Sequence, residues 1–342
     1  MAIVLALAAA LWGLGHVLRA PVPARILMIG LLYGGVLLLQ ILLPDGHPWR
    51  EALGGSARDW IAVGVVGAVI WAYAQGLKTL KTHVRPENKA TPQPSTTSTE
   101  LERNARHIVL REIGGPGQKR LKEARVLVVG AGGLGAPALQ YLAAAGIGTI
   151  GVIDDDVVEN SNLMRQVIHT DDRIGMPKVF SAEVAMIAQN PFVTIKPYHR
   201  RLTQDIAAEL FADYDLILDG TDDADTRYLV NETAVSARVP LVSAAITQWE
   251  GQISVFDPSC GAPCYACVFP NKSADGLAPS CAEGGVLGPL PGVMGAMMAV
   301  EAIKHIARAG QTLSGRMMIY DALYGDTRTI RIKKRADCAV CG

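Results

Sequence analysis

The chain has 342 residues, which is enough for one large domain or two smaller ones. Hydrophobic residues make up 50% of it, and 32 basic residues balance 32 acidic ones, so the formal net charge is zero. A neutral chain is not expected to bind nucleic acid by electrostatic attraction. Nearly all acids and bases lie beyond about residue 80, which indicates a membrane region followed by a soluble domain.

Three apolar stretches dominate the beginning of the chain. They have 17, 18 and 18 residues without Asp, Glu, Lys or Arg, so each approaches the length that crosses a bilayer core. The stretches are residues 2–18 (AIVLALAAALWGLGHVL), 26–43 (ILMIGLLYGGVLLLQILL) and 60–77 (WIAVGVVGAVIWAYAQGL). Residues 1–85 are therefore predicted to be a membrane region with about three transmembrane helices.

The basic residues around these stretches predict an orientation. Arg19 and Arg25 lie in the first loop, and Lys78, Lys81 and Arg85 follow the third stretch. Because basic loops stay inside, the soluble domain is expected in the cytoplasm, attached to the inner membrane by a multi-pass anchor. A cleaved signal peptide for the first stretch and a buried helical hairpin are the alternatives.

Residues 86–99 (PENKATPQPSTTST) are polar and rich in Pro, Ser and Thr. Such a segment cannot bury a core and is typical of a flexible tether. The folded domain is therefore expected at residues 100–342.

Residues 125–146 have the pattern of a nucleotide-binding unit. RVLVV predicts a buried strand, GAGGLG a tight turn, and the alanine-rich segment after it a helix. A second strand, residues 148–154, ends in Asp154, where a carboxylate can bond ribose hydroxyls. This order of elements predicts an α/β protein with a Rossmann-like, doubly wound sheet. The turn residues expected to approach phosphate are Gly130, Gly132, Gly133 and Gly135.

The residues beyond the second strand bear on which nucleotide binds. Arg165 and Lys178 suit a triphosphate, since a dehydrogenase has no need for cations at these positions. A further apolar strand, residues 214–219, is followed by Asp222, a candidate Mg²⁺ ligand. The alternative for the two cations is an ordinary solvated helix face.

Four of the six cysteines are paired by their spacing in the sequence. Two CxxC pairs are typical of a tetrahedral structural Zn²⁺ site, which would pin the C-terminal tail to the domain. Two redox dithiols are the alternative. The four residues are Cys264, Cys267, Cys338 and Cys341.

Cys281 is unpaired and lies in a loop, residues 271–285, that is rich in glycine and polar residues. A loop of this composition suits a mobile cover over an active site. A functional thiol and an incidental cysteine both remain open interpretations of Cys281.

Together these motifs resemble the ThiF/MoeB/HesA family, the bacterial relatives of the ubiquitin-activating enzymes. The resemblance extends over residues 103–342, and the motifs occur in the order of that family. They are RxxR at 103–106, GAGGLG, DxD at 154–156, NLxRQ at 162–166, GxPK at 175–178, TD at 221–222, the first CxxC, the Cys281 loop, GVMGxxxAxEAIK from 292 and the terminal CxxCG.

The resemblance implies ATP-dependent adenylation of the C-terminal glycine of a small ubiquitin-like sulfur carrier of the ThiS/MoaD type, with release of pyrophosphate. It implies that Asn162, Arg165 and Lys178 contact phosphates and that Asp222 coordinates Mg²⁺. Arg106 would act across a homodimer interface. Cys281 matches a loop cysteine that some members use in sulfur transfer or thioester formation. The product would serve molybdopterin or thiamin biosynthesis.

This sequence also departs from the family pattern. Arg103-Asn-Ala-Arg106-His107 replaces the usual RYxRQ, Met164 stands at a usually polar place, and Asp223 stands where Asn is commoner. A tRNA-modifying adenylating cyclase, a membrane-anchored NAD-dependent oxidoreductase and a non-catalytic membrane scaffold are the rival hypotheses. Isolated histidines, His169 among them, are interpreted as surface or capping residues.

Overall fold

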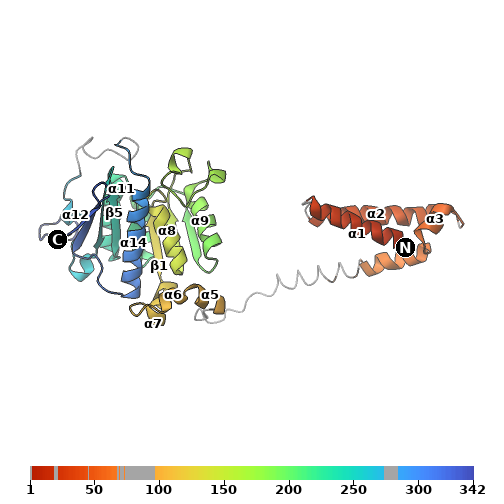
Figure 1. Ribbon diagram of the computed structural model, residues 1–342, viewed down its shortest axis with the longest axis horizontal. Helices are drawn as coiled ribbons and strands as arrows, with labels where there is room; N and C mark the ends of the chain where they lie inside the picture. The colour runs from red at the N-terminus through yellow and green to blue at the C-terminus, as the bar shows by residue number, and fades with distance from the viewer. Residues whose placement is uncertain are drawn as a thin grey trace. The chain divides into compact units, whose positions relative to one another are not determined.

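The computed structural model of the protein describes residues 2–18, 22–44, 46–67, 69, 73, 97–272 and 284–342. The chain divides into two compact units, Met1–Pro94 and Ser95–Gly342. Both are drawn in Figure 1, the first in red to orange and the second in yellow to blue. Most of the expected tether at residues 86–99 lies outside the described residues.

The described part of the N-terminal unit is mostly helical. Trp60 is hydrogen-bonded to Gly54 and to Tyr33. Its Nε1 donates to the Gly54 carbonyl at 2.9 Å, and its own carbonyl accepts the Tyr33 hydroxyl at 2.6 Å. The helices with printed bounds are α1 (Ala2–Val17), α2 (Val22–Leu42) and α3 (Pro48–Leu53).

Of the three expected membrane spans, the described residues of this unit show one candidate. One helix there, Ala24–Leu42, is long and apolar enough to cross a membrane. The first expected span forms α1, whose 16 residues rise by about 24 Å and fall short of a core about 30 Å thick. The third expected span, at residues 60–77, falls partly outside the described residues.

The C-terminal unit alternates helices and strands along most of its length. Its helices are α5 (Ser98–Arg103), α6 (Ala105–Ile108), α7 (Gly114–Glu123), α8 (Gly135–Ala145), α9 (Lys178–Gln189), α10 (Gln204–Ala212), α11 (Ala224–Ala237), α12 (Tyr265–Val268) and α14 (Pro289–Ala307), with short 3₁₀ turns at Asn160–Asn162, Asp171–Arg173 and Pro258–Cys260. Its strands are β1 (Arg125–Val129), β2 (Thr149–Ile153), β3 (Thr194–Tyr198), β4 (Leu216–Asp219), β5 (Leu241–Ile246), β6 (Glu250–Phe256), β7 (Arg316–Asp321) and β8 (Asp326–Arg331).

These strands form one eight-stranded sheet in the order β3-β2-β1-β4-β5-β6-β7-β8. The strands from β3 to β5 pair in parallel, and β5, β6, β7 and β8 pair antiparallel. The predicted Rossmann-like α/β sheet is therefore confirmed. The antiparallel extension was not part of the prediction.

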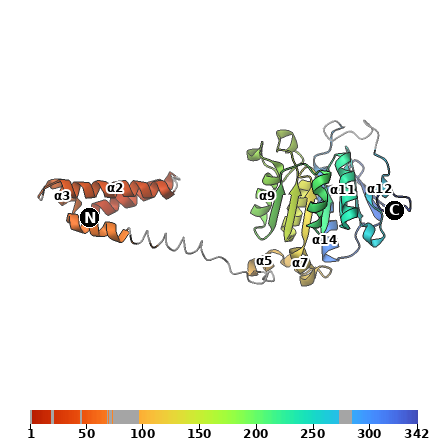
Figure 2. The same cartoon turned by 180° about the vertical axis from the view of Figure 1, so that it is seen from behind.

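Both faces of the sheet are covered by helices. Since successive side chains of a strand point to opposite sides, a central strand is buried on both faces. Val126 and Val128 pack with α8, α9 and α14 on one face, whereas Leu127 and Val129 pack with α10 and α11 on the other. Figure 1 shows α8, α9 and α14 over the near face, and Figure 2 shows α11 over the opposite face. This two-sided burial explains why β1 reads as a continuous apolar run.

Candidate functional site

The carboxyl ends of β1, β2 and β4 meet at one edge of the sheet. The register pairs Val129 with Ile153 on one side and with Asp219 on the other, so the three strands end level with one another. The glycine turn follows β1, Asp154 follows β2, and Gly220 follows β4. Ligands of doubly wound sheets bind at this edge, which makes these three loops the candidate nucleotide site.

The glycine turn has backbone geometry that a side chain would prevent. Gly130 has a φ of +92°, in the left-handed region that favours glycine. A Cβ on Gly135 would lie 1.9 Å from the Gly130 carbonyl oxygen, so α8 can begin there only with glycine. The turn therefore closes tightly between β1 and the first turn of α8, as a phosphate-binding loop requires.

Asp154 fastens this turn to the end of β2. Its Oδ2 accepts a hydrogen bond from the Ala131 N–H at 2.7 Å, and its Oδ1 accepts one from the Asp156 N–H at 2.8 Å. Burial raises the pKa of Asp154, and the positive charge of Lys178 together with these N–H donors partly offsets that effect. Each carboxylate oxygen has a further lone pair with which it could accept a ribose hydroxyl.

Lys178 is the first residue of α9, and its side chain lies buried beside the carboxylates of Asp154 and Asp156. Its Nζ is 2.6 Å from Asp156 Oδ2, whose own side chain is mostly exposed. The structure thus brings Lys178 next to the end of β2 although 22 residues separate it from Asp156. The solvated-face interpretation of Lys178 is wrong, because its side chain is buried.

Arg165 and Asn162 come from the segment between β2 and α9. Arg165 is half-buried, its Nη1 donates to the Ser161 carbonyl at 2.8 Å, and its Cδ lies 4.0 Å from the position of a Cβ on Gly133. The Asn162 side chain is buried and its Oδ1 accepts the Glu159 N–H at 3.2 Å. Arg165 is therefore beside the glycine turn, whereas the Asn162 side chain has a local role in holding its own 3₁₀ turn.

Asp222 lies exposed in the loop after β4. In the described part of the chain its carboxylate has no hydrogen bond or ion pair, so it is available to a metal. Its neighbour Asp223 is not, because its Oδ2 caps α11 by accepting the Thr226 N–H at 2.9 Å. The hydrogen bond from the Thr226 hydroxyl is the main reason that the pKa of Asp223 is lowered.

Arg227 holds the loop that carries Asp222. Its guanidinium is buried, donates to the Thr221 carbonyl, and lies 3.3 Å from Asp219 Oδ2. Asp219 is 0% exposed and also accepts the Thr221 hydroxyl at 2.6 Å and the Ser243 hydroxyl at 2.8 Å. This network fixes the backbone just before Asp222 at the carboxyl edge of the sheet.

Arg106 lies at the other end of the sheet. It is exposed on α6, which packs against α7, and α7 leads into the amino end of β1. Figure 1 shows α6 and α7 at the end opposite the glycine turn. The structure therefore does not bring Arg106 to the candidate site of its own chain. Cys281 lies outside the described residues, so its place relative to the site is not given.

The four paired cysteines form one cluster. Their Sγ atoms are 3.9 Å apart for Cys264–Cys267, 3.6 Å for Cys264–Cys338 and 3.4 Å for Cys267–Cys341. Four sulfurs around a tetrahedral zinc, with Zn–S about 2.3 Å, would lie about 3.8 Å apart. The donor set and its spacing therefore fit zinc, and the two motifs meet although they are 74 residues apart.

The thiols of this cluster have unequal pKa values. Burial raises the pKa of Cys264 and that of Cys341. Burial acts in the same direction on Cys338, but backbone N–H donors of Cys341 and Val340 outweigh it and lower the pKa of Cys338 to about 7. The Arg335 N–H also donates to Cys267 Sγ at 3.4 Å, as amides commonly do around structural metal sites.

The glycine turn and the cysteine cluster both lie in a part of the chain that matches a known protein family. Residues 104–340 match the ThiF family. The chain belongs to the ThiF family. This confirms the resemblance drawn from the motifs and covers both the candidate nucleotide site and the cysteine cluster.

Two relatives are similar to this chain at equal identity, and the match covers different shares of their own length. Sulfur carrier protein adenylyltransferase of Thermus thermophilus is 47% identical over 250 residues, which are 72% of this chain and 92% of the relative. Adenylyltransferase and sulfurtransferase MOCS3 of Bos taurus is 47% identical over 258 residues, 75% of this chain and 56% of the relative. The chain therefore spans little more than half the length of MOCS3.

A solved structure shows the same fold at lower identity. The crystal structure of E. coli MccB with ATP has a TM-score of 0.59 and 23% identity, and the match covers 66% of this chain and 69% of that chain. At this identity the likeness extends to the fold alone.

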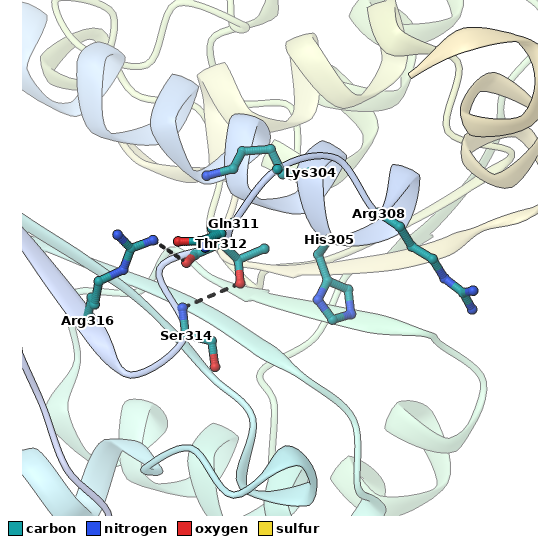
Figure 3. A pocket seen from close by; sticks show the side chains of 8 residues that line it. Lys304, His305, Arg308, Gln311, Thr312, Ser314 and Arg316 are labelled. Atoms are coloured by element: carbon teal, nitrogen blue, oxygen red, sulfur yellow. Dashed lines mark hydrogen bonds between the residues drawn. The ribbon is translucent and has the colours of Figure 1, made fainter. Parts of the chain in front are cut away.

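A cavity of about 420 Å³ in this ThiF-family chain lies away from the glycine turn, at the C-terminal end of α14 (Figure 3). Lys304 is 2.6 Å from Glu301, Arg316 donates to the Thr312 carbonyl at 2.8 Å, and Figure 3 shows Arg308 directed away from Arg316. Basic side chains here stabilise the C-terminal end of a helix.

Sequence reasoning missed two buried residues beside the candidate nucleotide site. His169 is 4% exposed, which contradicts its interpretation as a surface or capping residue. Gln166 is also buried, and its Oε1 has no partner in the described structure, while its Nε2 lies 3.7 Å from the position of a Cβ on Gly132. Gln166 belongs to the NLxRQ motif, which was a signal for it. His169 had no such signal.

Proposed function

We propose that this chain adenylates the C-terminal glycine carboxylate of a small ubiquitin-like sulfur-carrier protein, for sulfur transfer to molybdopterin or thiamin. The choice of a sulfur carrier as substrate follows the name of the Thermus thermophilus relative. The match covers 92% of that relative. The sulfurtransferase part of the name MOCS3 belongs to a longer protein and is not included in the proposal.

The observation that carries this proposal is the presence of two cations beside the loops at the carboxyl edge of the sheet. Lys178 lies buried at the end of β2, and Arg165 lies against Gly133. A triphosphate over this turn would have its charge met by the two side chains and by the backbone N–H groups of the turn. The pyrophosphate of a nicotinamide dinucleotide carries less negative charge than a triphosphate and can be bound by the glycine turn and the helix N-terminus alone.

The chemistry needs no protein nucleophile. A carboxylate oxygen of the carrier glycine attacks the α-phosphorus of ATP, the bond between this phosphorus and the α–β bridging oxygen breaks, and pyrophosphate leaves. The product is a carrier acyl-adenylate. Negative charge grows on the bridging oxygen and the leaving pyrophosphate, where Lys178 and Arg165 would stabilise it.

Two metal ions fit residues of this chain. Asp222 would hold Mg²⁺ together with phosphate oxygens, because its carboxylate is exposed at the carboxyl edge. That ion supplies neutralisation of phosphate charge. The cysteine cluster would hold zinc in a closed site of four thiolates, which supplies structural stability and not catalysis.

A homodimer is part of the proposal. Val157, Met164 and Val167, which border the nucleotide site, are 41%, 59% and 58% exposed, and exposed apolar side chains beside a site favour coverage by a partner. A second copy could also supply Arg106, which is far from the glycine turn of its own chain.

The proposal places the catalytic unit in the cytoplasm, attached to the inner membrane by the N-terminal unit. Its support is the apolar helix Ala24–Leu42, of which 11% is buried within the protein. A second or third span remains a proposal from the sequence. Fractionation with and without carbonate washing would test it, since a peripheral protein would be released and an integral one retained.

The test of the function is carrier-dependent exchange of labelled pyrophosphate into ATP. Full-length protein in detergent would be combined with small carriers that end in Gly-Gly, and with the same carriers shortened by the last glycine. We expect exchange only with the intact tail. Asp222→Ala should abolish exchange and leave the zinc content unchanged, whereas Asp223→Asn should retain exchange.

Other outcomes would contradict the proposal in different ways. Exchange without a carrier would mean that another carboxylate is the substrate. NADH turnover at the same site would support the oxidoreductase. Absence of both activities with every carrier would support the non-catalytic scaffold.

A further inference from the structure

We propose that His169 is a positioning residue for ATP, which holds the Ala131 carbonyl of the glycine turn and ties it to α9, the helix that begins with Lys178. This inference rests on the proposed function, since it assigns a role at the same site. It concerns the shape of the glycine turn and not the transfer of a proton.

The hydrogen bonds of His169 specify how the ring is protonated. Its Nε2 is 3.0 Å from the Ala131 carbonyl oxygen, and its Nδ1 is 2.9 Å from the Ser181 hydroxyl. A carbonyl oxygen can only accept, so Nε2 must carry the hydrogen, and in the neutral ring Nδ1 then accepts from Ser181. Burial, followed by the positive charges of Lys178 and Arg173, lowers the pKa of His169 to about 4 and keeps the ring neutral near pH 7.

Ala131 is the residue at which hydrogen bonds fix the backbone of the glycine turn. It lies between Gly130 and Gly132, which have no side chains that could fix the backbone. Its N–H donates to Asp154 at 2.7 Å and its carbonyl accepts from His169, so both polar groups of the residue are bound. Together these bonds set the direction of the neighbouring peptide groups that would face phosphate.

The same bonds form a closed ring of contacts through three segments. His169 contacts Ala131, Ala131 contacts Asp154, and Asp154 accepts the Asp156 N–H. Asp156 pairs with Lys178 at 2.6 Å.

The ring closes through the first turn of α9. Ser181 lies three residues after Lys178 and bonds back to His169. Loss of His169 would therefore release the glycine turn from the helix that carries the phosphate-binding lysine.

The experiment compares three variants by ATP affinity and by exchange kinetics. His169→Phe keeps a ring but removes both hydrogen bonds, and His169→Gln restores a donor toward Ala131. His305→Phe, on the last turn of α14, is the matched control for a half-buried histidine elsewhere. ATP affinity is measured by isothermal titration of full-length protein without carrier.

We expect His169→Phe to weaken ATP binding about tenfold, the factor that corresponds to one lost hydrogen bond. The KM for ATP in exchange should rise by a similar factor while kcat changes less than about threefold. His169→Gln should recover most of the affinity, and His305→Phe should bind ATP like the natural protein. A merely structural role would lower thermal stability without this division between KM and kcat.

Wild-type affinity for ATP in a folded His169→Phe variant would overturn the inference, as would a His169→Gln variant no better than His169→Phe. If His169→Phe fails to fold, Ser181→Ala replaces it, because it removes only the hydroxyl that bonds Nδ1. We expect Ser181→Ala to weaken ATP binding about threefold, and unchanged affinity would overturn the inference.

The titration also separates this inference from the proposed function. Weaker ATP binding in His169→Phe, with no exchange for any carrier even in the natural protein, would support the inference and contradict the carrier as substrate. A natural protein that binds no ATP would overturn both.

Discussion

The carboxyl edge of the sheet and the cysteine cluster are two polar regions of one domain, and they are built in opposite ways. At the edge, Lys178 and Arg165 come from separate segments, and each contacts a residue of the loop beside it, Asp156 and Ser161 respectively. In the cluster, two short motifs meet in the interior and their sulfurs contact one another. The first region leaves the Asp222 carboxylate exposed, and the second is closed around the volume of one ion.

This difference indicates how function and stability are divided between the two regions. Structural metal sites are closed, with every ligand supplied by the protein, whereas sites of chemistry keep positions open. Loss of a phosphate-facing cation at the edge should therefore reduce activity without unfolding the domain. The cluster should lose stability and leave the chemistry intact where the fold survives. Four predictions test this division, beginning with the largest expected effect.

Lys178→Met should reduce carrier-dependent exchange on the order of a thousandfold, because a cation at the phosphates is lost. Stability should change little, since Asp156 is mostly exposed and its ion pair contributes modestly. Exchange kinetics and thermal unfolding measure the two effects. Lys119→Met, on the exposed side of α7, is the control and should leave both unchanged. A large fall in melting temperature for Lys178→Met would show that the edge also supports the fold.

Cys338→Ser should lose bound zinc and lower the free energy of unfolding by about 3 kcal/mol, since metal binding energy contributes to folding. The melting temperature should fall by about 10 °C for a domain of this size. Metal analysis and thermal unfolding provide the measurements. Cys260→Ser, at an exposed cysteine, should change neither quantity. Loss of ATP affinity below the new melting temperature would contradict the division.

Stability should fall between pH 7 and pH 5 by about 2 kcal/mol through His169 alone. The pKa of this residue is about 4 in the folded protein against an ordinary 6.5, so the unfolded chain takes up a proton first as pH falls. Its contribution to stability is full above pH 6.5 and is lost progressively toward pH 4. Urea unfolding of the natural protein and of His169→Gln would measure it. Equal slopes with pH for the two proteins would contradict the assignment.

Asp223→Ala should lower the free energy of unfolding by about 1 kcal/mol, the usual effect of losing a helix N-cap. Exchange should continue, in contrast to Asp222→Ala one residue earlier. Urea unfolding and the exchange assay distinguish the two positions. Loss of exchange in Asp223→Ala would show that the reaction depends on Asp223, the helix cap, and would contradict the assignment of the functional carboxylate to Asp222.

The features predicted well are those encoded by local pattern. The strand at residues 125–129 has the bounds of β1, because a continuous apolar run before a glycine turn has few alternatives. The spacing of the CxxC motifs likewise predicted the cluster that the structure shows. The membrane region was predicted less well, since apolar composition alone does not tell a span from the shorter helix α1.

The features that could not be predicted depend on packing between distant segments. His169 has the local pattern of any isolated histidine, and only its position beneath Ala131 buries it. The same holds for Arg227, whose charge appears solvated along α11 until Asp219 and Thr221 are brought to it by β4.

The amino-acid sequence by itself therefore determined the Rossmann-like unit, the ThiF-family motifs and the four candidate zinc ligands, because each depends on residues close together in the chain. Only the tertiary structure decided which polar groups lie buried around the glycine turn and which acid, Asp222 or Asp223, remains free. The reason is that burial and hydrogen-bond partners come from contacts across strands and helices, which no local pattern specifies.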